Sequence, residues 1–100
     1  MNETIVKIEK AKAKNKKYTA IVKNKSTGKT RRVNFGDSRY SQFKDRTPIQ
    51  AYASQNHGDK KRRDNYFNRH SGTTNKTEAI KKEKAKGVFT PKLLSHKYLW

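Results

Sequence analysis

The sequence predicts a small α+β domain in which a β-hairpin packs on two or three short helices, with an extended basic arm at the N-terminus. Three observations predict this class. Two neighbouring segments alternate apolar and polar residues with period two, which is typical of strands. Three later segments begin with helix-capping residues. The chain has 100 residues, of which 30% are hydrophobic, and this limits it to one thin core.

Residues 1–17 are expected to form the arm. They open with a short apolar patch, Ile5, Val6 and Ile8, which is also compatible with an edge strand. A lysine-rich run follows, and because like charges repel each other such a run stays solvated. We therefore expect a single folded domain over residues 18–100.

The hairpin is expected to have strands near 18–24 and 30–35. Tyr18, Ala20 and Val22 are two residues apart, and Val33 and Phe35 repeat this spacing in the second segment. The segment 24–29 between them has turn composition, and its Gly28 can adopt a positive φ. A further turn is expected at residues 35–38.

Three helices are expected after an ambiguous stretch, 40–56, in which aromatic residues are spaced as on short helical turns. Asp59 is a candidate N-cap for a helix over 60–70 that ends at Gly72. Asn75, with Glu78 three residues later, predicts a helix over 76–86 within a basic linker near 72–87. Thr90 before Pro91 predicts the start of a last helix.

The charge points to a polyanionic partner. Lys and Arg number 26 against 8 Asp and Glu, so the formal net charge is +18. The basic runs recur along the chain, as is typical of proteins that bind a nucleic-acid backbone without sequence preference. The expected contacts are Lys12, Lys14, Lys16, Lys17, Arg31, Arg32, Lys60, Lys61, Arg62, Arg63 and Arg69.

The C-terminal segment is expected to anchor the chain to protein. Its apolar residues are Leu94, Tyr98, Leu99 and Trp100. Burying a large apolar side chain is more favourable than leaving it in contact with water, so we expect Trp100 to be buried. It would fold back onto the hairpin face of Val22, Val33 and Phe35, or insert into a neighbouring subunit.

Catalysis, cofactors and metals are not expected. The chain lacks a P-loop, a dinucleotide fingerprint and a nucleophile elbow. A metal nuclease centre could be assembled from His57, Asp59 and Asp64. However, helix capping and ion pairing account for the two aspartates without catalysis. With no cysteine there is neither a thiol ligand nor a disulfide, which fits a reducing compartment. No apolar run approaches the length of a membrane span, so we expect no membrane partner.

One set of residues carries a resemblance. The set is Phe35-Gly36, Tyr40, the block H-x-D-x-x-R-R-x-x-Y-x-x-R-H from His57 to His70, Gly87, and the ending S-x-x-x-L-W from Ser95 to Trp100. In this pattern the chain resembles a family of small basic proteins of large DNA viruses of algae and protists and of some tailed phages. The resemblance implies a viral origin and a component of the virus particle.

The expected function is therefore structural. We expect a minor capsid or internal virion protein whose Lys and Arg side chains contact genome phosphate or an acidic capsid surface. The alternative is a free, sequence-independent DNA- or RNA-binding protein, chromatin-like or ribosome-associated. The expected location is the virion or the interior of the infected cell, and no small-molecule substrate is expected.

Overall fold

Three strands form one antiparallel sheet in the order β1-β2-β3. The strands are β1 (Glu3–Lys10), β2 (Lys16–Asn24) and β3 (Thr30–Asp37) in a computed structural model that describes residues 1–100. Tyr18 lies opposite Phe35, and Ala20 lies opposite Val33. The expected hairpin is confirmed; β2 begins two residues earlier than expected, and β3 ends two residues later. Gly28 in the connecting turn has the positive φ of 74° that its position demands.

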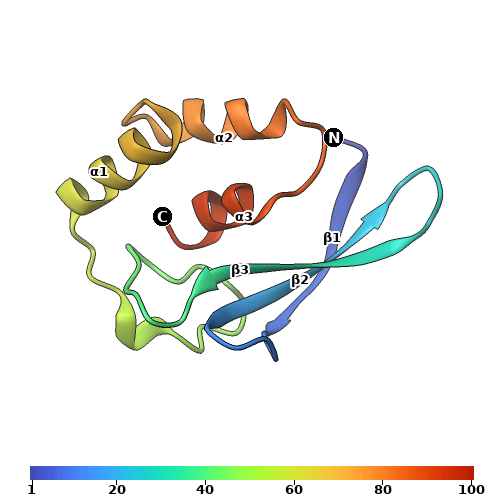
Figure 1. Cartoon of the computed structure of the whole chain (residues 1–100), viewed down its shortest axis with the longest axis horizontal. Coiled ribbons are helices and arrows are strands. Elements are labelled where there is room, and N and C mark those ends of the chain that lie inside the picture. Colours follow the sequence, from blue (N-terminus) through green and yellow to red (C-terminus); the bar gives the residue numbers. More distant parts are fainter.

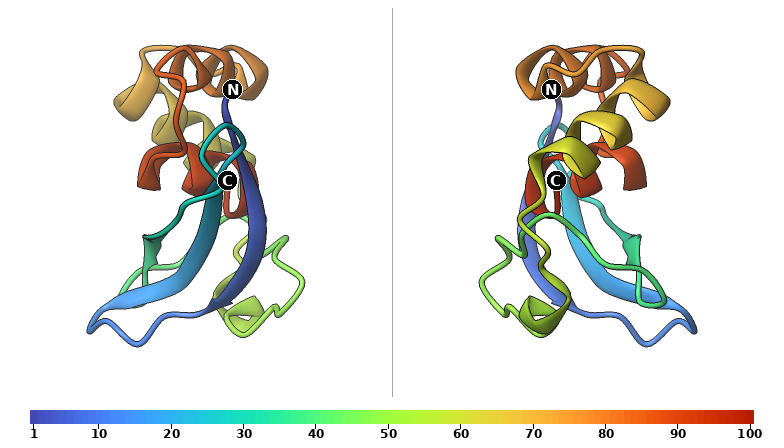
Figure 2. Two further views of the ribbon diagram at one scale, coloured as in Figure 1. Left: turned by 90° about the vertical axis from the view of Figure 1, so that its right-hand side faces the viewer. Right: turned by 90° about the vertical axis from the view of Figure 1, so that its left-hand side faces the viewer.

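The three helices lie on one side of the sheet in two layers (Figures 1 and 2). They are α1 (Lys60–Ser71), α2 (Lys76–Lys84) and α3 (Pro91–Tyr98). Helix α3 contacts β3 and also packs on α2, which in turn packs on α1. The α+β class is thus confirmed, with α3 between the sheet and the other two helices. None of the helices combines the length and apolarity needed to cross a membrane.

The core lies between the sheet and α3. Tyr18, Ala20 and Val22 point to this side and are fully buried, as are Leu93 and Leu94 of the helix. A smaller cluster of Tyr66, Phe67 and Ala79 joins α1 to α2, and Trp100 packs against both clusters.

All three predicted helix caps are present. The Asp59 side chain accepts hydrogen bonds from the backbone N–H groups of Lys61 and Arg62 at 2.9 and 3.2 Å. Asn75 accepts one from Glu78, and Thr90 accepts one from Leu93. The helix expected over 76–86, within the basic linker near 72–87, is present as α2, which ends two residues earlier than expected, at Lys84.

The expected arm over 1–17 was wrong for its first half, which forms strand β1 at the edge of the sheet, the alternative that the apolar patch had left open. The apolar patch belongs to this strand: Ile5 and Ile8 pack against the core, while Val6 lies at a bulge and is 57% exposed. The bulge interrupts the period-two pattern, which is why the strand was not evident from alternation alone.

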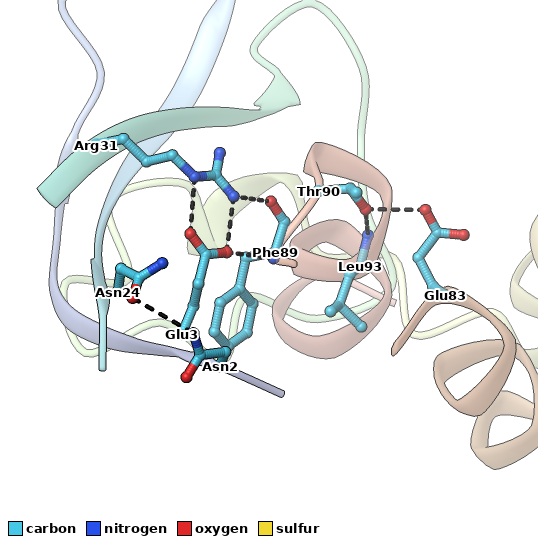
Figure 3. A network of polar contacts seen from close by, with 8 residues as sticks. All are labelled: Asn2, Glu3, Asn24, Arg31, Glu83, Phe89, Thr90 and Leu93. Carbon is cyan, nitrogen blue, oxygen red and sulfur yellow. Dashed lines mark hydrogen bonds and ion pairs between the residues drawn. The ribbon is translucent and has the colours of Figure 1, made fainter. Parts of the chain in front are cut away.

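A partly buried ion pair fixes the start of β1 to the far end of the chain (Figure 3). Glu3 is 8% exposed and accepts two hydrogen bonds from the Arg31 guanidinium, both at 2.8 Å. It also accepts one from the Phe89 N–H at 2.8 Å, while Arg31 donates to the Phe89 carbonyl. The hydrogen bonds from Arg31 lower the pKa of Glu3 despite its burial.

The long segment between β3 and α1 is held by internal hydrogen bonds and contains one short 3₁₀ turn, Ala53–Gln55. Asp45 is buried and accepts hydrogen bonds from the Tyr18 hydroxyl and from the backbone and hydroxyl of Thr47. Burial would raise the pKa of Asp45, but these hydrogen bonds lower it overall. The segment also pairs with the C-terminus, since Arg46 N–H donates to the Tyr98 carbonyl at 2.9 Å.

Candidate nucleic-acid interface

A groove of about 470 Å³ lies where the sheet, α1, α3 and the C-terminal residues meet. The beginning of β2 and the end of β3 form one wall, the C-terminal half of α1 forms another, and α3 completes it. Tyr40 stands in the wall and is 65% exposed, more than any other large hydrophobic side chain. The lining of the groove includes three aromatic residues, Tyr40, Tyr66 and Trp100, as well as charged side chains.

Cations dominate the groove. Lys16 of β2, Arg69 of α1 and Lys92 of α3 line it from three different elements. Asp37 is the one acid in its lining, and hydrogen bonds from Arg39 lower the pKa of Asp37 to about 2. This carboxylate is already paired with Arg39 at 2.8 Å. The pKa of His70 is lowered by partial burial and by the charges of Arg69 and Lys92.

The floor of the groove depends on Gly36. This residue has a φ of 76°, and a Cβ placed on it would lie 2.8 Å from a methyl group of Leu99 and 3.1 Å from Lys17. Only glycine allows the C-terminal segment to approach β3 so closely. Phe35-Gly36 begins the set of residues that carries the resemblance, and Leu99-Trp100 ends it. The two are in contact in the folded chain.

Trp100 forms the side of the groove next to α1. Its ring stacks on Tyr66 at a centroid distance of 4.3 Å and an interplanar angle of 5°. His57 lies 5.3 Å from it, so two residues of the His57–His70 block hold the indole. Trp100 folds back as expected, but it is only partly buried, and its stacking partner is Tyr66 of α1 and not the hairpin face. Leu94 and Leu99 are at most 1% exposed, so as anchors for a partner protein they were wrong: they fill the chain's own core.

The predicted phosphate contacts do not form one patch. Lys16 and Arg69 come together in the groove. Lys12 and Arg32 line a second hollow of about 370 Å³ near the turn between β1 and β2, together with Lys10, but Arg32 also pairs with Glu9 there. Lys14 lies exposed in the same turn.

The first turn of α1 carries the remaining expected contacts. Lys60, Lys61 and Arg62 are exposed there, and Arg62 donates a hydrogen bond to the Ser41 hydroxyl. Arg63 is only half-exposed, because its guanidinium lies 4.5 Å from the centre of the Phe43 ring.

One of the predicted contacts was wrong, and a second is already engaged within the fold. Lys17 is 1% exposed, and its ammonium donates hydrogen bonds to the Tyr40 carbonyl and the Gln42 side chain. Burial lowers the pKa of Lys17 to about 8. Arg31 is occupied by Glu3 and by a backbone carbonyl. The Lys17 ammonium is therefore not available to phosphate, whereas the Arg31 side chain is paired with Glu3 but remains 46% exposed.

A further group of cations lies around Phe43. Arg46 and Arg63 both face this ring, and one guanidinium nitrogen of Arg46 is buried without a hydrogen-bond partner. Burial and the charges of Arg46 and Arg63 lower the pKa of Lys76 to about 8. No side-chain carboxylate forms an ion pair with any of the three. Nothing in the local sequence indicated that these residues approach each other.

Comparisons with known proteins add no relative. No family model, curated protein or solved structure matches the chain. Among the residues that carry the resemblance, Gly36, Tyr66, Leu99 and Trp100 line the groove, and His57 packs against Trp100 outside its lining. No three acidic or histidine side chains are placed to hold a metal ion.

Lys92, Tyr40 and His70 were not among the expected contacts, although Tyr40 and His70 belong to the residue set that carries the resemblance. Lys92 follows the helix cap at Thr90, and its ammonium reaches the His70 carbonyl at the end of α1 at 3.1 Å. This contact joins residues far apart in the chain. The exposure of Tyr40 also depends on the surrounding fold, and neither feature has a local sequence signal.

Proposed function

We propose that the protein is a non-enzymatic binding protein that contacts nucleic-acid phosphates through its unpaired cations, as a minor capsid or internal protein of a virus particle. One observation carries the phosphate binding. Only five of the 26 Lys and Arg side chains lie within ion-pair distance of a carboxylate. The remaining Lys and Arg side chains have no carboxylate partner within the chain.

The acids cannot supply that partner, because the fold uses most of them. Six of the 8 carboxylates accept hydrogen bonds inside the structure, among them the helix cap Asp59 and the buried Glu3 and Asp45. A surface with this much uncompensated charge attracts polyanions and favours phosphate contact over base reading.

Binding to duplex DNA should weaken steeply with salt, because each neutralised phosphate releases counterions. For about six phosphate contacts the affinity should fall about a thousandfold between about 50 and about 200 mM salt. Fluorescence anisotropy with two unrelated duplexes measures this, and we expect similar affinities for both. An affinity that does not change with salt would contradict the proposal, as would a strong preference for one sequence.

The place in a virus particle is supported by the sequence resemblance, and a second function is favoured by the packing of the C-terminus. Because Leu94 and Leu99 are internal, the chain has fewer apolar side chains left to anchor it in an assembly. This favours a free, sequence-independent nucleic-acid-binding protein. Quantitative proteomics separates the two: enrichment in purified particles over infected-cell lysate supports the virion protein, and depletion supports the free one.

A further inference from the structure

We propose that the groove between β3, α1 and α3 takes an unpaired nucleotide of a single-stranded nucleic acid, so that the protein prefers single strands to duplexes. This inference rests on the proposed binding of nucleic acid and assigns it a site. It follows from three properties of the groove: its size, its charge, and the exposed ring at its edge.

The size fits one small group. A volume of about 470 Å³ falls within the range of sites that take a single small molecule, about 300–1,000 Å³. A base inside a duplex is stacked on both faces and presents only its edge. It cannot enter such a site unless it leaves the helix. An unpaired nucleotide can enter without this step.

The charges match a phosphodiester. Lys16, Arg69 and Lys92 approach from three elements, and Asp37 is neutralised by Arg39. A strand that crosses the groove would therefore place its phosphates between cations that have no carboxylate partner of their own. Basic grooves with aromatic walls bind single strands in this manner.

Tyr40 supplies the surface for a base. Its ring is 65% exposed, whereas its backbone is fixed, because its N–H donates to the Asp37 carbonyl and its own carbonyl accepts from the buried Lys17 ammonium at 2.8 Å. The buried lysine thus has a positioning role: it holds an exposed aromatic ring at the wall of a basic groove. Trp100, already stacked on Tyr66, forms part of the same wall.

The test compares a single-stranded oligothymidine of about twelve nucleotides with a duplex of equal length at one salt concentration. The single strand should bind about tenfold more tightly. Trp100 is the one tryptophan, so its fluorescence reports on the groove directly. We expect the oligothymidine to quench it and the duplex to leave it nearly unchanged.

Two variants with matched controls locate the site. Tyr40→Ala should lower single-strand affinity about tenfold, the loss of one base stack, and duplex affinity less than about twofold. Ile49→Ala, which also truncates an exposed apolar side chain, should change neither. Arg69→Gln should weaken single-strand binding more than Lys61→Gln, which removes the same charge from the same helix outside the groove.

The outcomes separate this inference from the general function. Salt-dependent binding that is equal for single strand and duplex, and insensitive to Tyr40→Ala, overturns the groove assignment and leaves phosphate binding intact. Absence of binding to either form overturns both. Self-association that Tyr40→Ala abolishes, without oligonucleotide binding, would assign the groove to a second copy of the chain and overturn the inference.

Discussion

Gly36 shows how one residue determines whether the C-terminus can dock. Its positive φ and its contact with Leu99 are separate constraints, and both exclude a side chain. Gly87 after α2 has a similar φ of 78°, but a Cβ added to it would meet nothing within 4 Å, so it carries only the first constraint. Comparing substitutions at Gly36 and Gly87 therefore separates the cost of the backbone conformation from the cost of the close contact with Leu99.

Gly36→Ala should destabilise the protein by about 3 kcal/mol, since the cost of a positive φ, about 1–2 kcal/mol, adds to the contact with Leu99. Gly87→Ala should lose only the conformational part. Urea unfolding followed by circular dichroism measures both free energies of unfolding. Equal losses for the two variants would mean that Leu99 moves aside freely, contrary to the packing described here.

At the scale of elements, the helices are joined by polar contacts as well as by apolar ones. His96 of α3 is fully buried, with Nδ1 2.9 Å from the Tyr66 hydroxyl and Nε2 3.1 Å from the Ser71 hydroxyl of α1. Burial lowers the pKa of His96 to about 4. The charge of Glu83 opposes this shift, and those of His70, Lys92 and Lys76 add to it. The imidazole is therefore neutral in the folded protein at neutral pH.

Acid should loosen the contact between α1 and α3. Between the unfolded pKa of about 6.5 and the folded pKa of about 4, the unfolded chain binds a proton that folded His96 does not. The contribution of His96 to the free energy of unfolding is therefore fully present above about pH 6.5. Below that pH the free energy of unfolding should fall by up to about 1.4 kcal/mol per pH unit. Urea unfolding at a series of pH values measures the slope.

The matched variants are His96→Gln and His70→Gln. The first should be less stable at neutral pH but show a shallower slope between about pH 6.5 and about pH 4.5, because the buried titrating group is gone. His70 is exposed, so its replacement should leave most of the slope in place. An unchanged slope in His96→Gln would assign the acid sensitivity to other groups.

At the scale of the whole molecule, local signals predicted the elements but not how they close around one another. The hairpin and the three helix starts follow from period two and from Asp59, Asn75 and Thr90, which act within a few residues of themselves. Strand β1 was only an alternative to an extended arm, because its bulge breaks the pattern and Glu3 contacts Arg31 and Phe89 only in the folded chain.

The same limit applies to the site. Lys17 has the same lysine-rich surroundings as Lys14 and Lys16, and only the loop that folds over it makes it internal. Composition predicts that a positive surface exists. Composition does not determine which of the cations become buried in the folded chain. It also does not determine that Lys16, Arg69 and Lys92 lie around one groove.

The last two residues should be essential to the fold as a whole. Leu99 is 1% exposed, contacts Gly36, and accepts a hydrogen bond from Lys44 N–H at 3.1 Å, while Trp100 joins the two apolar clusters. A single large-to-small core substitution costs about 2–5 kcal/mol, and deleting both residues should cost more. This loss is comparable to the total free energy of unfolding of a small domain. Far-UV circular dichroism should show an unfolded chain.

Trp100→Phe is the control for that deletion, because phenylalanine can still stack on Tyr66, and it should remain folded. Salt-dependent DNA binding should persist in the deleted chain, since the charge is unchanged, while the preference for single strands should be lost. A deleted chain that stays folded would contradict the role given to this segment.

The contacts between Glu3 and Phe89 and between Gly36 and Leu99 also set the order of events during synthesis. The sheet can pair early, but the face that carries Tyr18, Ala20 and Val22 stays uncovered until α3 emerges from the ribosome, and Leu99 must follow before the groove has a floor. Translation at about 5–20 residues per second therefore leaves this apolar face bare for seconds.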